Sequence, residues 1–281
     1  MKIIHTVSGL QKELASRRKA GEALGFVPTM GALHRGHVAL IERSVAENAV
    51  SVASIFVNPA QFNDKNDLLK YPRTLEADCK LLEKTGNDIV FAPEAEEIYP
   101  EPDIRQFEFG AMANVMEGEF RPRHFNGVAQ VVSRLFDIVK PGRAYFGEKD
   151  FQQLAIIRLL VQQLHLNVRI VACPIVREDN GLAMSSRNTR LSREQRQEAS
   201  AIFRTLFESR QIREHYPVAG LKLWVTERLN RIPGFRVEYF DIVDGTSLQS
   251  IRNWEETECP VGCIAVFVGE VRLIDNVSYA G

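Results

Sequence analysis

The feature that most constrains the fold is a regular alternation of short apolar runs with amphipathic helical patterns, which continues to about residue 176. Residues 24–28 form one such run, and a glycine turn and a helical face with Val38, Ile41 and Val45 follow it. Further segments predict strands at 50–57, 88–91, 143–147 and 168–174, and helices at 75–82, 127–139 and 151–164. This alternation favours an α/β fold with a doubly wound, Rossmann-like parallel sheet covered by helices on both faces.

The pattern changes after residue 176. Ser192 and Gln195 form a predicted capping box, and the helix after it has an apolar face made of Ala199, Ile202, Phe203, Leu206 and Phe207. A second helix is expected at 218–229, a strand at 236–243, and a hairpin of 263–268 with 271–274 that turns at Gly269 and Glu270. We therefore expect two domains, 1–176 with the parallel sheet and 177–281 as a smaller α+β domain.

Composition excludes several classes of protein. The 281 residues are 45% hydrophobic and 25% charged, as in ordinary globular chains. The formal net charge of -1 offers no basic field for nucleic acid. The apolar runs are far shorter than the roughly 20 residues of a membrane span, and the first residues lack a secretory pattern, so a cytoplasmic location is predicted. Four cysteines are too few for a disulfide scaffold, and Cys259 with Cys263 lacks two zinc ligands, so core or surface thiols are expected.

Chemistry-bearing residues concentrate at the first predicted strand-turn-helix junction, 28–37, which contains two of the six histidines. Gly31 and Gly36 allow close backbone approach, and a loop leading into a helix N-terminus after a parallel strand offers N–H groups to phosphate. The imidazoles of His34 and His37 are candidate donors to the same phosphate. The alternative is a pair of helix-capping or packed histidines, while zinc is disfavoured because no third ligand is near in the sequence.

These residues belong to a longer pattern. The segment 29–37 resembles the HxGH signature of the nucleotidyltransferase superfamily, and V-P-T-M-G-A-L-H-R-G-H at 27–37 resembles one family within it, pantothenate synthetase, or pantoate–β-alanine ligase. Four more segments match this family in order: F-V-N-P-A-Q-F at 56–62, Y-P-R-T at 71–74, F-G-E-K-D-F-Q-Q at 146–153 and M-S-S-R-N at 184–188. The resemblance covers nearly the whole chain.

The resemblance implies an ATP-dependent ligase. The pantoate carboxylate would attack the α-phosphate of ATP in the presence of Mg²⁺, pyrophosphate would leave, and the β-alanine amine would attack the pantoyl adenylate to release pantothenate and AMP. It also implies a homodimer formed through domain 1–176, which would bind nucleotide and pantoate, with 177–281 as a lid. It leaves the Mg²⁺ ligands unknown.

The same resemblance implies roles for individual residues. The catalytic residues would be His37, His34, Lys149 and Arg187, with His37 as the proton donor. Those at the ATP site would be Met30, Gly31, His34, His37, Gly147, Glu148, Lys149, Asp150, Val176, Met184, Ser185, Ser186 and Arg187. Gln61, Gln153 and Asn58 would bind substrate, the two glutamines holding pantoate and Gln61 lying close to the β-alanine site.

Other interpretations remain open at this point. Taken alone, 147–150 is typical of a solvated turn in which Asp150 caps the next helix, and 184–188 of a polar loop. Arg123 stands where the family commonly has glycine, and a positive φ there would be strained. The alternative functions are a nucleotidyltransferase that leaves the nucleotide on its product, an aminoacyl-tRNA synthetase fragment, which the net charge disfavours, and a binding protein without catalysis.

Overall fold

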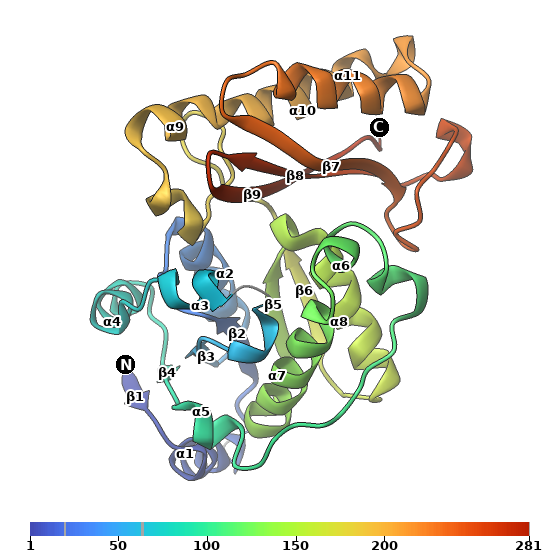
Figure 1. Cartoon of the computed structure of the whole chain (residues 1–281). Coiled ribbons are helices and arrows are strands. Elements are labelled where there is room, and N and C mark those ends of the chain that lie inside the picture. The colour runs from blue at the N-terminus through green and yellow to red at the C-terminus, as the bar shows by residue number, and fades with distance from the viewer. Residues whose placement is uncertain (20, 63–64, 281) are drawn as a thin grey trace. The chain divides into compact units, whose positions relative to one another are not determined.

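The computed structural model describes residues 1–19, 21–62 and 65–280, and the chain divides into two compact units (Figure 1). Unit 1 comprises Met1–Phe109, Arg121–Glu148 and Gln153–Pro174. Unit 2 comprises Gly110–Phe120, Lys149–Gln152 and Ile175–Gly281. Two short stretches from the first part of the chain therefore belong to the second unit.

Unit 1 is built on a six-stranded sheet in the order β1-β4-β3-β2-β5-β6, and each neighbouring pair is parallel. Its strands are β1 (Lys2–Ile4), β2 (Leu24–Thr29), β3 (Val50–Ile55), β4 (Ile89–Phe91), β5 (Arg143–Gly147) and β6 (Arg169–Cys173). The predicted parallel sheet is confirmed, and β1 is a strand that the sequence pattern did not indicate.

Helices cover both faces of this sheet. Phe26 of β2 meets Phe136 edge to face, whereas the next residue, Val27, lies in a buried cluster with Ile41 and Leu82. Because successive strand residues point to opposite faces, the helix of Phe136 lies on one face and those of Ile41 and Leu82 on the other. The helices are α1 (Val7–Lys19), α2 (Arg35–Glu47), α3 (Lys65–Lys70), α4 (Leu75–Glu83), α5 (Ala95–Ile98), α7 (His124–Val139) and α8 (Phe151–Gln163), with the 3-10 turns η1 (Pro59–Gln61) and η3 (Glu148–Asp150).

Unit 2 is a three-stranded antiparallel sheet in the order β7-β8-β9, with helices packed on it. The strands are β7 (Phe235–Asp244), β8 (Pro260–Val268) and β9 (Val271–Ser278). The predicted hairpin is confirmed, since Val268 pairs with Val271 around Gly269, whose φ is 58°. The helices are α6 (Glu117–Phe120), α9 (Arg193–Glu198), α10 (Ser200–Ile212) and α11 (Val218–Asn230), with 3-10 turns at Gly110–Ala113 (η2), Ser186–Arg190 (η4), Arg213–His215 (η5) and Trp254–Glu256 (η6).

The predicted helix starts and faces in unit 2 are largely confirmed. Ser192 and Gln195 form the expected capping box at the start of α9. Ile202 and Leu206 of α10 are buried as predicted, but Phe207 is 48% exposed, so its assignment to the apolar face was wrong. The buried stripe continues instead to Ser209, which packs inward because its hydroxyl is hydrogen-bonded.

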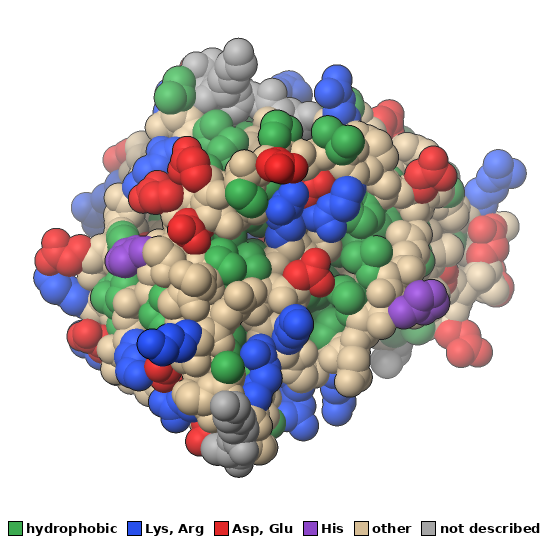
Figure 2. All heavy atoms as spheres, turned by 90° about the horizontal axis from the view of Figure 1, so that it is seen from below, with side chains coloured by type: hydrophobic (Ala, Val, Ile, Leu, Met, Phe, Trp, Pro, Cys, Tyr) green, Lys and Arg blue, Asp and Glu red, His purple; other side chains and the backbone are tan. Residues whose placement is uncertain are grey.

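The cysteines, the hydropathy of the helices and the surface charges are consistent with the composition. All four cysteines are free thiols, with Cys259 exposed and the other three buried, as predicted. Among the residues described, no helix has the length and apolar character needed to cross a bilayer. On the face drawn in Figure 2, basic and acidic side chains are interspersed, in keeping with the near-zero net charge.

Candidate active site

The carboxyl ends of β2 and β5 frame the candidate site in unit 1. The chain runs from β2 through β3 to β4 on one side of β2, and places β5 and β6 on the other side. The switch in direction therefore falls between β2 and β5, where doubly wound sheets bind their ligands. Met30 and Gly31 follow β2 directly, and Gly147 is the last residue of β5. Three predicted ATP-site residues thus lie at the same edge of one sheet.

The two histidines cap the helix that follows β2. His34 is the N-cap of α2 and its Nδ1 accepts the N–H of Gly36 at 3.2 Å, while the N–H of His34 donates to Nδ1 of His37 at 3.3 Å. The ring centroids lie 4.1 Å apart. Since each Nδ1 accepts a hydrogen bond, the proton of each neutral ring is on Nε2. Helix capping and phosphate binding are therefore compatible, because they use different nitrogens.

A buried carboxylate holds the turn before these histidines. Asp78, 3% exposed, accepts the N–H of Ala32 at 2.9 Å and that of Leu33 at 2.8 Å. Gly31 has a φ of +79°, and a Cβ there would lie 3.0 Å from Asp78 Oδ2. The expectation that backbone N–H groups at this junction are open to phosphate was wrong for Ala32, Leu33 and Gly36, whose N–H groups bind protein acceptors. Sequence reasoning missed Asp78, whose only signal is its place in the first turn of α4.

The predicted substrate residues Asn58 and Gln61 lie on and beside η1. The side-chain Nε2 of Gln61 approaches Sδ of Met30 at 2.9 Å, so the structure brings these two predicted residues together. The backbone carbonyl of Gln61 is bound by His124 Nδ1 at 2.8 Å and by Arg121 Nη2 at 3.4 Å. The turn that carries Gln61 is thereby fixed to the start of α7.

Two positions at the start of α7 have a constrained backbone, one by close packing and the other by a positive φ. A Cβ on Gly127 would lie 2.3 Å from the carbonyl oxygen of Ala60, so only glycine lets α7 approach η1 this closely. Arg123, the N-cap of α7, has a φ of 64°. This confirms that the position is left-handed, and an L-residue there costs about 1 kcal/mol relative to glycine. The chain keeps the left-handed turn in spite of the substitution.

The predicted glutamine and charged residues after β5 divide between the units. Gln153 is half-buried on α8 and belongs to unit 1. Lys149 and Asp150 lie in η3 and belong to unit 2, where Lys149 Nζ stands 4.0 Å from Asp150 Oδ1. The carbonyl of Lys149 accepts a hydrogen bond from Asn276 Nδ2 at 3.1 Å. The hairpin strand β9 thus fixes the backbone of a predicted catalytic residue.

Unit 2 also brings together the predicted residues of 176–187. The N–H of Met184 donates to the carbonyl of Val176 at 3.0 Å, which closes the segment into a loop. Ser185 caps η4 by accepting the N–H of Arg187 at 3.2 Å, and Ser186 is buried within this turn. The half-buried Arg187 side chain is therefore carried by a capped turn and not by an open polar loop.

An ion pair between the partly buried Arg177 and the buried Asp275 anchors this loop to the hairpin. Arg177 donates from Nη1 to Asp275 Oδ2 at 2.7 Å and from Nη2 to Oδ1 at 3.0 Å. The guanidinium of Arg177 also lies 4.4 Å from the ring centroid of Phe203. Asp275 is 4% exposed. Neither member of the pair was predicted, and no local sequence signal joins residues 98 positions apart.

The chain matches a known protein family over almost its whole length. A family model described as pantoate–β-alanine ligase matches residues 2–278. The chain is 59% identical over 279 residues to pantothenate synthetase of Bacteroides fragilis strain YCH46, with 99% of each chain covered. It is 61% identical over 282 residues to pantothenate synthetase of Phocaeicola vulgatus, with 100% of each covered.

Solved structures give the same result. The chain resembles the crystal structure of pantothenate synthetase from Thermus thermophilus, with a TM-score of 0.93, 44% identity and 100% of each chain covered. It also resembles pantoate–β-alanine ligase from Francisella tularensis complexed with beta-gamma ATP and β-alanine, with a TM-score of 0.85, 35% identity, and 99% of this chain and 98% of that chain covered.

Proposed function

The chain belongs to the pantoate–β-alanine ligase family, and from this premise we propose that it condenses pantoate with β-alanine through a pantoyl adenylate. The pantoate carboxylate attacks the α-phosphate of ATP and pyrophosphate leaves. The β-alanine amine then attacks the acyl carbon, and pantothenate and AMP are released. Family membership favours this ligase over a nucleotidyltransferase that keeps the nucleotide on its product, a synthetase fragment or a binding protein without catalysis.

The observation that carries the proposal is the pair of hydrogen bonds to the histidine Nδ1 atoms at the β2–α2 turn. With Nδ1 of His34 and His37 committed to backbone N–H groups, each ring keeps an Nε2–H donor. Preorganised donors of this kind stabilise charge that develops on phosphate oxygens in the transition state. We assign His37 as the main donor and His34 as its support, with Met30 and Gly31 lining the same end of the sheet.

The remaining proposed roles follow the chemistry of each side chain. Lys149 and Arg187 offset charge on the departing pyrophosphate. Asp150 accepts from the ribose hydroxyls, and Gly147, Glu148, Val176, Met184, Ser185 and Ser186 complete the nucleotide site. Gln61 and Gln153 bind pantoate, because a carboxamide donates hydrogen bonds without placing a negative charge beside the carboxylate nucleophile.

We propose that Mg²⁺ enters with ATP as part of the substrate. Within residues 1–19, 21–62 and 65–280, no group of three or more His, Cys, Asp or Glu side chains is arranged to hold a metal ion. Mg²⁺ usually keeps several waters and is held by substrate phosphates with one or two carboxylates, so it needs no cluster of three protein ligands. When bound, the ion neutralises charge on the phosphates.

We further propose a cytoplasmic homodimer formed through unit 1. The dimer rests on the family resemblance, and sedimentation equilibrium tests it directly. The location is supported by four free thiols, three of them buried, which suit a reducing compartment.

Exchange of labelled pyrophosphate into ATP tests the reaction order. We expect exchange with enzyme, ATP, Mg²⁺ and pantoate when β-alanine is absent, since adenylate formation needs only the first two substrates. Omission of pantoate is the matched control and should abolish exchange. Exchange that requires β-alanine would contradict the sequential mechanism, and exchange indifferent to pantoate would contradict the substrate.

A further inference from the structure

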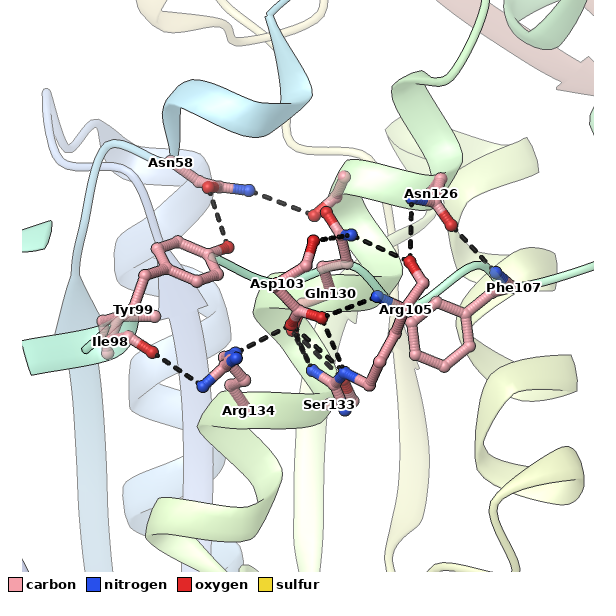
Figure 3. Close-up of polar contacts among 11 residues, drawn as sticks. Asn58, Ile98, Tyr99, Asp103, Arg105, Phe107, Asn126, Gln130, Ser133 and Arg134 are labelled. Carbon is pink, nitrogen blue, oxygen red and sulfur yellow. Dashed lines mark hydrogen bonds and ion pairs between the residues drawn. The ribbon is translucent and has the colours of Figure 1, made fainter. Parts of the chain in front are cut away.

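The side-chain amide of Asn58 is surrounded by partners that fix its orientation. Asn58 is 1% exposed. Its Oδ1 accepts the hydroxyl of Tyr99 at 2.9 Å and the N–H of Ala60 at 3.3 Å. Its Nδ2 donates to the carbonyl of Gly127 at 3.1 Å and to Oε1 of Gln61 at 3.3 Å. Figure 3 shows Tyr99 and Asn58 meeting in this way beside α7.

These partners allow only one orientation of each amide. A backbone N–H faces one end of the Asn58 amide and a backbone carbonyl faces the other, so its oxygen and nitrogen cannot exchange places without two mismatched contacts. The Nδ2 group of Asn58 then requires Gln61 to turn Oε1 toward it. The Nε2 of Gln61 consequently points the other way, toward Met30. The group that Gln61 offers at the proposed site is therefore a donor.

Tyr99 is itself held rigidly. The guanidinium of Arg134 lies 5.2 Å from its ring centroid, and the Phe56 ring lies 6.2 Å away. Arg134 is fixed in turn by Asp103, with Nε 2.7 Å from Oδ2 (Figure 3). Burial, with the nearby charge of Asp103, raises the pKa of Tyr99 to about 12. The phenol therefore remains protonated, and able to donate, near neutral pH.

We propose that Tyr99 is a positioning residue for pantoate: its hydroxyl, together with the backbone groups of Ala60 and Gly127, holds the Asn58 amide, which orients Gln61 so that Nε2 faces the substrate. Asn58 then serves substrate binding through Gln61, since its own polar atoms all bind protein groups. This inference rests on the proposed function, because it takes Gln61 as a pantoate residue. A carboxylate or hydroxyl oxygen of pantoate accepts from the donor that the relay presents.

The test is a double-mutant cycle of Tyr99→Phe and Gln61→Ala, read as the KM for pantoate in pyrophosphate exchange. Tyr99→Phe removes the hydroxyl and keeps the ring contacts with Arg134 and Phe56. We expect the KM for pantoate to rise roughly 5-fold to 10-fold, as for the loss of one buried hydrogen bond, with the KM for ATP unchanged. In the Gln61→Ala background the same substitution should have no further effect.

The matched control is Tyr145→Phe. Tyr145 is fully buried and its hydroxyl also bridges two polar side chains, Glu47 and Asn48, away from Gln61. It should cost stability without changing the KM for pantoate. Thermal unfolding of every variant verifies the fold, and calorimetric titration with pantoate replaces exchange for a variant that exchanges too slowly.

The outcomes separate this inference from the proposed function. Equal effects of Tyr99→Phe in both backgrounds, or equal effects on the KM values of pantoate and ATP, would overturn the relay. A large effect of Gln61→Ala with none from Tyr99→Phe would also overturn it while leaving the proposed function intact. If Gln61→Ala itself leaves the KM for pantoate unchanged, the assignment of Gln61 in the proposed function is wrong.

Discussion

The two regions proposed to face the phosphates of ATP are held in place in different ways. At the β2–α2 turn of unit 1, Nδ1 of His37 accepts the backbone N–H of His34, which lies three positions earlier in the chain. In unit 2, the loop that leads to Arg187 is tied to β9 by Arg177 and Asp275, 98 positions apart. The two histidines of the first region are held by local capping, with Asp78 holding the turn before them, whereas the loop of the second region is tied down by a distant ion pair. Local geometry leaves a signature in the sequence, whereas tertiary anchoring does not.

The loop in unit 2 is anchored at more than one point. Glu178 accepts from Asn188 Nδ2 at 2.8 Å and from both Nε and Nη2 of Arg196 at 2.9 Å. Asn276, the neighbour of Asp275, donates to the carbonyl of Lys149. Adjacent residues of one strand thus hold both proposed nucleotide-binding segments of this unit. A substitution in β9 should therefore change the KM for ATP more than the KM for pantoate.

The largest expected effect breaks the locally held region. His37→Ala should slow pyrophosphate exchange roughly 100-fold to 1,000-fold, as for the loss of one preorganised donor, and His34→Ala should slow it less. His37→Asn keeps a short-range acceptor for the N–H of His34 but lacks a donor at the Nε2 position. His37→Gln restores a donor there. Near-normal exchange by His37→Asn would show that the histidine serves only as a cap.

The β2–α2 turn also shows what sequence could and could not predict. The strand, the glycine and the histidines were predicted because each is specified within a few residues. The destination of the N–H groups of Ala32 and Leu33 was not, because Asp78 lies more than 40 positions away. In unit 2 the same limit applies to the stretch 110–120, where Glu117 meets Arg272 across 155 positions.

The N-terminal elements were missed for a different reason. Helix α1 is polar, and among its residues with described side chains Leu10 and Leu14 alone are fully buried, so its apolar periodicity is too weak to recognise. Strand β1 has only three residues. Both are stabilised by packing against the rest of unit 1 and not by their own propensity.

The next largest effect breaks the tertiary anchor. Asp275→Asn leaves the guanidinium of Arg177 with no carboxylate at that position, and breaking one side of a buried pair costs about 3 kcal/mol of unfolding free energy. We expect the KM for ATP to rise roughly 10-fold while the KM for pantoate changes little, because the loop that carries Arg187 loosens. Urea denaturation and initial rates measure the two quantities.

An exposed ion pair of the same unit provides the control for this substitution. Arg228 and Glu208 are 2.6 Å apart with side chains 46% and 40% exposed. Glu208→Gln should change stability by less than about 1 kcal/mol and leave both KM values unchanged. If Asp275→Asn also leaves the KM for ATP unchanged, the loop that carries Arg187 does not depend on this distant anchor for ATP binding.

The smallest expected effect concerns the charge of Asp103 in unit 1, and it tests whether this carboxylate stabilises the unit. The side chain of Asp103, 3% exposed, accepts hydrogen bonds from Arg105 and Arg134. These hydrogen bonds, of which the one from Arg105 contributes most, hold the pKa of the carboxyl well below its usual range. A carboxyl whose folded pKa lies below the unfolded value of about 3.9 contributes stability above that pH and loses it as the pH falls toward the folded pKa. Asp103→Asn should therefore unfold more easily than the parent by about 1 kcal/mol at pH 7, a value kept small because Arg105 is partly exposed and screened. The gap should narrow progressively as the pH falls below about 4. Urea denaturation of both proteins across this range measures the gap, and a gap that stays constant with pH would show that the charge of Asp103 does not stabilise the segment carrying Tyr99.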